Sequence, residues 1–252
     1  MSGFWLIGGD LNTARYGFAG AGTQTAGLCC GGAVAGGSFS AVTEEYDGAS
    51  WLLGNNLNAA RSGLAGAGTQ TAGLCCGGYV EANYFAVTEE YNGTSWSLGG
   101  DLNTPRSGLA GAGTQTAGLC CGGYEEANYF AVTEEYDGTS WSAGGNLNTA
   151  RYILAGAGTQ TAGLCFGGYV GGSSSATEEY DGASWSAGGN LNIARHILAG
   201  AGTQTAGLCC GGYVGGSSSA TTEEYDGASW SLGGDLNTAR KEIAGSIQVA
   251  PC

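Results

Sequence analysis

The sequence predicts an all-β fold made of five similar four-stranded units, and two observations carry this prediction. First, a segment of about 45 residues recurs five times, with Trp and Arg at fixed places in it. Second, each copy holds four short stretches of strand character, separated by Gly-rich, Asn-Gly or Asp-Gly turns. Four strands in a unit of this length are typical of one blade of a β-propeller.

Single aromatic and basic residues mark the repeat. The tryptophans are Trp5, Trp51, Trp96, Trp141, Trp185 and Trp230. The arginines are Arg15, Arg61, Arg106, Arg151, Arg195 and Arg240. Between them recur the strings Ala-Gly-Thr-Gln-Thr-Ala-Gly-Leu-Cys and Thr-Glu-Glu-Tyr, the second followed by Asp-Gly or Asn-Gly. We therefore divide one domain, residues 1–252, into repeats of about 16–61, 62–106, 107–151, 152–195 and 196–240.

The elements of repeat 62–106 can be justified in chain order. The expected strands are 62–68, 73–76, 86–91 and 95–98. A polar Thr-Gln-Thr turn separates the first two strands, a double glycine ends the second, and Asn92-Gly93 is a two-residue hairpin signal before the fourth. A helix over 80–91 is rejected, because the equivalent stretch 170–180 reads Val-Gly-Gly-Ser-Ser-Ser-Ala-Thr-Glu-Glu-Tyr, a poor helix former.

The ends of the chain leave two strands beyond five complete blades. The chain opens on a fourth strand around Trp5, within the apolar stretch 4–7, and closes on a first strand over residues 243–249. We favour five four-stranded blades with these extra N- and C-terminal strands paired at the seam. A six-position ring with one thin blade is the second choice, and pairing of the spare edges with another chain is the third.

The order of marker residues resembles the kelch repeat. Gly77-Gly78, Tyr91, Trp96 and Arg106 match the order and rough spacing of the kelch double glycine, Tyr, Trp and following Arg, and the match recurs five times. The Asn-Leu-Asn-Thr-Ala-Arg and Gly-Thr-Gln-Thr-Ala wording also resembles kelch-type arrays in tail and other structural proteins of aquatic bacteriophages. The first resemblance implies a kelch-like propeller, and the second implies a virion or tail-fibre protein that binds other virion proteins or the host surface.

Composition narrows the classes of partner. The formal net charge is −14, so phosphate backbones and anionic lipid surfaces are poor partners and no nucleic acid is expected. No apolar run approaches the ~18 residues of a membrane helix, so no membrane insertion is expected. The start lacks a basic flank, so we expect no secretory signal peptide. The resemblance to phage arrays implies a location in a virion, with the cytoplasm as the alternative.

The charged and aromatic residues of the repeat predict structure more than catalysis. One Glu of each Glu-Glu pair is expected to meet a repeat Arg while the other faces solvent, since adjacent strand residues point to opposite faces. Calcium held by these carboxylates is the lesser alternative. The tryptophans are expected to pack between blades, although they could also stack on sugars.

The cysteines recur in the second strand of each repeat. They are Cys29, Cys30, Cys75, Cys76, Cys120, Cys121, Cys165, Cys209 and Cys210, with Cys252 at the end. Adjacent cysteines should face opposite neighbours, and Phe166 in one slot indicates an apolar environment. Packed sheets lie about ~10 Å apart and a disulfide needs Cα atoms within about ~7 Å, so we expect buried thiols without blade-to-blade disulfides.

No catalytic, cofactor or metal site is predicted, and we expect no enzyme. His196 is the single histidine, and Tyr, Ser and Lys occupy its position in other copies, so we expect it to be exposed and without a role. A copper site, as in kelch-like oxidases, needs several histidines, and zinc or copper ligands would have to converge from separate blades. The expected function is therefore that of a structural or interaction protein.

The loops between the second and third strands differ between copies and form the candidate binding site. The candidate residues are Tyr79, Glu81, Asn83, Tyr84, Tyr124, Glu126, Asn128 and Tyr129. Propeller loops of this kind share one rim, and Tyr and Asn suit polar or carbohydrate recognition. We expect an off-centre host-recognition site over repeats two and three. The alternative is that the loop sequences differ through neutral drift among the copies. The other functions considered are an intracellular kelch scaffold and a lectin-like module or degenerate oxidase. A homo-oligomer could form through edge strands.

Overall fold

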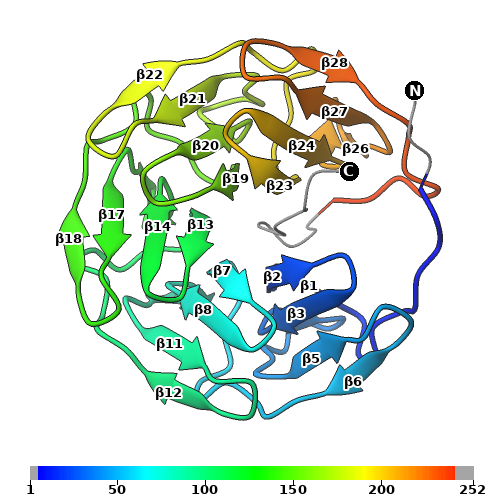
Figure 1. The fold of residues 1–252 in the computed structure, drawn as a ribbon, viewed down its shortest axis with the longest axis vertical. Helices are drawn as coiled ribbons and strands as arrows, with labels where there is room; N and C mark the ends of the chain where they lie inside the picture. The colour runs from blue at the N-terminus through cyan, green and yellow to red at the C-terminus, as the bar shows by residue number, and fades with distance from the viewer. Residues whose placement is uncertain (1–4, 242–252) are drawn as a thin grey trace.

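The computed structural model describes residues 5–241, and these residues form strands and turns without a helix. Five four-stranded antiparallel sheets are arranged as the blades of a five-bladed β-propeller (Figure 1). No described segment is a helix long and apolar enough to cross a membrane. The predicted all-β propeller of five four-stranded blades is confirmed.

Each blade runs from an innermost strand beside the axis to an outermost strand (Figure 1). Blade 1 is β2 (Ala19–Thr23), β3 (Ala26–Cys30), β5 (Thr43–Tyr46) and β6 (Trp51–Leu53); blade 2 is β7 (Ala65–Thr69), β8 (Ala72–Cys76), β11 (Thr88–Tyr91) and β12 (Trp96–Leu98); blade 3 is β13 (Ala110–Thr114), β14 (Ala117–Cys121), β17 (Thr133–Tyr136) and β18 (Trp141–Ala143). Blade 4 is β19 (Ala155–Gly158), β20 (Gly163–Phe166), β21 (Thr177–Tyr180) and β22 (Trp185–Ala187); blade 5 is β23 (Ala199–Thr203), β24 (Ala206–Cys210), β27 (Thr222–Tyr225) and β28 (Trp230–Leu232).

Short ribbons interrupt the expected loops between second and third strands. They are β9 (Tyr79–Val80) with β10 (Asn83–Tyr84), β15 (Tyr124–Glu125) with β16 (Asn128–Tyr129), and β25 (Tyr213–Val214) with β26 (Ser217–Ser218). In blade 1 the corresponding segment β4 (Ala33–Val34) pairs with β1 (Arg15–Tyr16). The variable segments of blades 2, 3 and 5 are therefore short hairpins.

The core lies between blades, as the sequence predicted for the tryptophans. Trp141 of blade 3 donates from Nε1 to Oγ1 of Thr88 in blade 2 at 2.9 Å, and its ring lies 4.9 Å from that of Tyr136. The same Trp-to-Thr bond joins each later blade to the one before it: Trp96 to Thr43, Trp185 to Thr133 and Trp230 to Thr177. Each bond satisfies the indole N–H inside an apolar interface.

Every repeat Arg from Arg15 to Arg195 is paired with a buried Glu, as expected. The pairs are Arg15–Glu44 at 2.6 Å, Arg61–Glu89 at 2.5 Å, Arg106–Glu134, Arg151–Glu178 at 3.0 Å and Arg195–Glu223 at 2.5 Å. The expectation for the second Glu was wrong in blades 1 to 4. Glu90, for example, accepts a 2.5 Å hydrogen bond from the Tyr136 hydroxyl of the next blade. Both faces of such a blade are covered by neighbours, so the outward direction leads to another blade instead of solvent.

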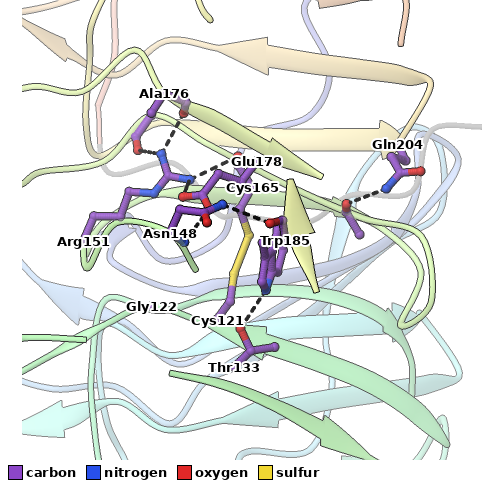
Figure 2. The surroundings of a disulfide bond; sticks show 12 residues. Cys121, Gly122, Thr133, Asn148, Arg151, Cys165, Ala176, Glu178, Trp185 and Gln204 are labelled. Atoms are coloured by element: carbon purple, nitrogen blue, oxygen red, sulfur yellow. Dashed lines mark hydrogen bonds and ion pairs between the residues drawn. A yellow bond between two sulfur atoms is a disulfide. The ribbon is translucent and has the colours of Figure 1, made fainter. Parts of the chain in front are cut away.

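The cysteine prediction was half wrong. The cysteines of the second strands are buried except for the less enclosed Cys210, and adjacent ones face opposite neighbours, but Cys30–Cys75 and Cys121–Cys165 form disulfides between blades. Figure 2 shows Cys121–Cys165 beside the Trp185–Thr133 bond and the Arg151–Glu178 pair. Propeller blades converge toward their axis, where the strands are Ala-Gly-Ala-Gly, and the Cα atoms come within 7.8 Å at Cys121–Cys165. This distance is shorter than the ~10 Å between flat stacked sheets, and it exceeds the expected ~7 Å limit, so both parts of the distance argument were wrong for these pairs. Cys252 lies outside the described residues.

The seam between blades 5 and 1 differs from the other interfaces. The first described residues run along the outside of the ring there (Figure 1), and Trp5 donates from Nε1 to the Gly234 carbonyl at 2.8 Å. Leu6 and Ile7 are 77% and 86% exposed, and the stretch Trp5–Ile7 belongs to no strand, so the expected N-terminal strand is wrong for these residues. In this stretch the chain contacts the linker that follows blade 5 and does not pair as a strand. Phe4 and residues 243–249 lie outside the described residues.

Candidate functional site

The predicted site residues lie on two neighbouring ribbons. Tyr79, Glu81, Asn83 and Tyr84 belong to the β9–β10 hairpin, and Tyr124, Glu126, Asn128 and Tyr129 to the β15–β16 hairpin. The structure brings the two hairpins together, because the rings of Tyr84 and Tyr124 meet edge to face with centroids 5.9 Å apart. Glu81, Asn83, Glu126 and Asn128 are exposed, while Tyr79, Tyr84 and Tyr124 are half-buried.

The aromatic contacts continue well beyond these two hairpins. A series of rings, which we call the aromatic arc, comprises Phe39, Tyr79, Tyr84, Tyr124, Tyr129, Tyr152, Tyr169, His196 and Tyr213. Tyr152 stacks at 5.1 Å on both Tyr124 and Tyr129, and His196 lies 5.2 Å from Tyr169 and 5.4 Å from Tyr213. The arc therefore follows one rim of the propeller from blade 1 to blade 5.

Sequence reasoning missed the members of the arc outside blades 2 and 3. His196 is half-buried, which corrects the expectation of an exposed residue, and its Nδ1 lies 2.9 Å from Ser173 Oγ. Burial and the nearby Lys241 ammonium lower the pKa of His196. The signal was present in the sequence, since Tyr follows the double glycine in repeats two to five and an aromatic residue follows Arg in repeats one, four and five.

Backbone hydrogen bonds hold the arc in place. Each ribbon is tied to the residue after the repeat Arg, as where Tyr124 and Ser107 exchange N–H to carbonyl bonds of 2.9 and 3.0 Å. The next residues are joined in series around the axis: Gly63 N to Gly17 O, Gly108 N to Gly63 O, Ile153 N to Gly108 O and Ile197 N to Ile153 O. The rings consequently stand on a platform that links all five blades.

A cavity of about 400 Å³ opens inside this platform. Its walls include the rings of Tyr16, Tyr79, Tyr84, Tyr124 and Tyr152. Residues of all five repeats and of the innermost strands line it, so it lies at the axial mouth of the propeller. We expected a site over blades 2 and 3 alone; those blades supply three of the five tyrosines in the wall, but the cavity itself is axial.

Unusual backbone conformations gather at the same rim. Among the described residues, the non-glycine residues with positive φ are Glu81, Glu126, Ala127, Ile153 and Ile197. The equivalents of Glu81 and Ala82 in blade 5 are Gly215 and Gly216, so a left-handed turn that elsewhere uses glycine carries larger side chains in blades 2 and 3. Such positions cost about 1–3 kcal/mol each, and they are typical of functional sites.

The polar groups at the rim include one contact between a hydroxyl and the imidazole of His196. Ser173 and His196 touch, but no described carboxylate hydrogen-bonds the second nitrogen of the ring, and no group of three His, Cys, Asp or Glu side chains within residues 5–241 has metal-binding geometry. Burial raises the pKa of Tyr84 and Tyr152, so both phenols stay neutral at pH 7. The chain matches no protein-family model and no curated protein.

Proposed function

We propose that the protein is a non-enzymatic recognition module that binds its partner through the aromatic arc and the cavity inside it. The observation that carries the proposal is the series of ring contacts across five blades, four members of which, Tyr79, Tyr84, Tyr124 and Tyr152, line an axial opening of about 400 Å³. Binding energy in protein interfaces concentrates in a few aromatic anchors held by a rigid scaffold. Here the ribbons that carry anchors are bonded to the residue after the repeat Arg, and the next residues are bonded from blade to blade.

The differences between copies support the same proposal. The blade interiors repeat nearly unchanged, whereas the hairpins change from Glu-Ala-Asn-Tyr-Phe in blades 2 and 3 to Gly-Gly-Ser-Ser-Ser in blades 4 and 5. The side chains of blades 2 and 3 are kept in a left-handed backbone that glycine adopts at lower cost. Contact of these side chains with a partner would explain why the chain keeps non-glycine residues in this backbone conformation.

The setting we propose is a phage virion or tail appendage, with other virion proteins or a host-surface glycan or protein as the partner. It rests on the resemblance of the repeat wording to kelch-type arrays of phage structural proteins. An intracellular kelch scaffold or a lectin-like module would use the same rim.

A hairpin exchange tests the proposal. Residues 81–85 and 126–130 are both replaced by Gly-Gly-Ser-Ser-Ser, the sequence of residues 215–219. The backbone bonds survive, because Ser219 N donates to Gly212 O as Phe85 N donates to Gly78 O, both at 2.9 Å. Binding to a glycan array and to a panel of intact bacterial cells is then compared between the exchanged and unaltered proteins.

We expect the exchange to weaken retention at least about tenfold while the melting temperature is maintained. The matched control replaces Thr71 and Thr116, exposed on the turns at the opposite ends of the strands, with Ala and should bind like the unaltered protein. Equal retention of the exchanged and unaltered proteins would contradict the proposal. The binding surface would then have to be sought on the opposite rim.

A further inference from the structure

Cysteines of neighbouring second strands meet at one register at three successive interfaces between blades. Disulfides join blades 1 and 2 and blades 3 and 4 at this register, and the second of them is drawn in Figure 2. At the interface between them, that of blades 2 and 3, the equivalent residues are Cys76 and Cys120, and both are thiols. The two thiols are buried in one apolar cluster and hydrogen-bond each other. The middle interface thus holds a pair of thiols where its two neighbours hold disulfides.

We propose that Cys76 and Cys120 form a third blade-to-blade disulfide when the chain folds in the presence of a small-molecule disulfide. The oxidised chain is then covalently linked from blade 1 to blade 4, because each second strand carries its adjacent cysteines on opposite faces. The bridge joins β8 to β14, the strands that lead into the β9–β10 and β15–β16 hairpins. The pairing is independent of what those hairpins bind.

The spacing of the blades supports this pairing. A Cβ built on Gly66, Gly111 or Gly156 would lie 2.6, 2.5 or 2.6 Å from a glycine carbonyl oxygen of the preceding blade, so the innermost strands approach equally at the three interfaces. The Trp-to-Thr bonds across the same interfaces are each 2.9 Å long. At the first and third interfaces this spacing gives Cα separations of 7.9 and 7.8 Å between bridged cysteines. The middle interface has the same spacing, so a bridge there requires no different arrangement of the blades.

The next interface shows what prevents a bridge. Between blades 4 and 5 the register brings Phe166 opposite Cys209, and both belong to one core cluster. Cys209 is buried like Cys120, but the facing position carries a phenyl ring in place of a sulfur. The chain therefore contains its own control, a buried thiol at the same register without a facing cysteine.

The reaction is thiol–disulfide exchange in two steps. The Cys76 thiolate attacks one sulfur of the small disulfide, whose S–S bond breaks and releases one small thiolate. The Cys120 thiolate then attacks the Cys76 sulfur of this mixed disulfide, forms the protein bridge and releases the second small thiolate. The protein loses two protons and two electrons, and the small disulfide is reduced to two thiols. Burial and the Cys76 thiol raise the pKa of Cys120, so the exchange takes place during folding, before the interface closes.

Refolding of the full chain tests the proposal. The reduced, unfolded chain is refolded with a mixture of reduced and oxidised glutathione, free thiols are blocked at acid pH, and the denatured product is digested with trypsin without reduction. Cleavage after the repeat arginines leaves the adjacent cysteines of each second strand in one peptide. Two disulfides connect the peptides of repeats one to four as two linked pairs, whereas the third disulfide connects all four peptides into one unit.

We expect the unit of four peptides, with Cys209 recovered as a blocked thiol. The urea midpoint of the bridged protein should lie about 1 M above that of Cys120→Ala, because the cross-link constrains the unfolded chain. Two linked pairs or four separate peptides, with Cys76 and Cys120 blocked or each carrying glutathione, would overturn the proposal.

Variants assign the linkage to the two thiols. Cys76→Ala and Cys120→Ala should each return the digest to two linked pairs. Cys209→Ala is the matched control, because it removes a buried thiol at the same register and should leave the unit of four intact. A unit of four that persists in Cys120→Ala contradicts the assigned bridge, since the linkage then runs through other cysteines.

Discussion

The interior of the propeller and its loop rim follow opposite rules. Between blades the same bonds recur without variation, with Trp Nε1 donating to Thr Oγ1 at 2.9 Å at each of the four successive interfaces from blade 1 to blade 5. At the rim each repeat has its own hairpin, and the described residues with strained backbones gather there. Repetition in this chain therefore marks what keeps the blades together, and variation marks where a partner can be selected.

The interior and the rim also differ in how their charged side chains are paired. The interior pairs its buried charges locally, as where Glu134 accepts from Arg106 and from the backbone and side chain of Asn103, while one or two buried guanidinium nitrogens of each repeat Arg from Arg15 to Arg195 have no hydrogen-bond partner. The rim instead leaves glutamates exposed beside half-buried tyrosines. Substitutions should thus reduce stability in the interior and affinity at the rim, and three measurements can break or sharpen this division.

The largest effect is expected from a buried ion pair. Glu134→Ala leaves the Arg106 guanidinium buried without its carboxylate, and removing one partner of such a pair costs about 3–5 kcal/mol. Urea unfolding should report this loss of unfolding free energy. The double variant Arg106→Met with Glu134→Leu is the control, and it should recover much of the loss because no charge remains buried. A loss below about 1 kcal/mol in Glu134→Ala would show that the pair is not part of the stabilising interior.

The next effect concerns the bonds between blades. Replacing Cys121 and Cys165 with Ala removes a disulfide that closes a loop of 44 residues, with an expected cost of about 2–4 kcal/mol. The matched control replaces Cys76 and Cys120, which occupy the same register one interface earlier as a thiol pair and should cost less. Burial and the Cys76 thiol raise the pKa of Cys120, so it should resist alkylation at pH 8 until the protein unfolds. Peptide mapping that recovers Cys121 and Cys165 as free thiols would refute the disulfide.

The sequence was sufficient for the fold but insufficient for the site. Blade number and strand order followed from the 45-residue period, because strand and turn signals agree in every copy. The disulfides were missed because the distance between blades depends on how far a residue lies from the axis, which a linear pattern does not contain. The arc was missed because Tyr152 and His196 occupy a position that Ser fills elsewhere, and only the closed arrangement brings them beside Tyr124 and Tyr213. The Glu90 contact to Tyr136 likewise required a neighbouring blade on the second face.

The smallest effect has the opposite sign and tests the rim directly. Replacing both Glu126 and Ala127 with Gly should raise the unfolding free energy by about 1 kcal/mol, because their φ angles of +50° and +90° strain L residues more than the added flexibility of glycine costs. The reverse change in blade 5, Gly215→Glu with Gly216→Ala, should lower it by a similar amount, and chemical denaturation measures both.

An interior glycine provides the contrast for this last measurement. A Cβ added at Gly111 would lie 2.5 Å from the Gly66 carbonyl oxygen of the neighbouring blade, so Gly111→Ala should destabilise the protein by more than the rim changes. Stabilisation at Glu126 and Ala127 means that the rim keeps these side chains for a purpose other than folding. Destabilisation there would instead make the hairpin part of the stabilising interior and remove one support of the proposed recognition function.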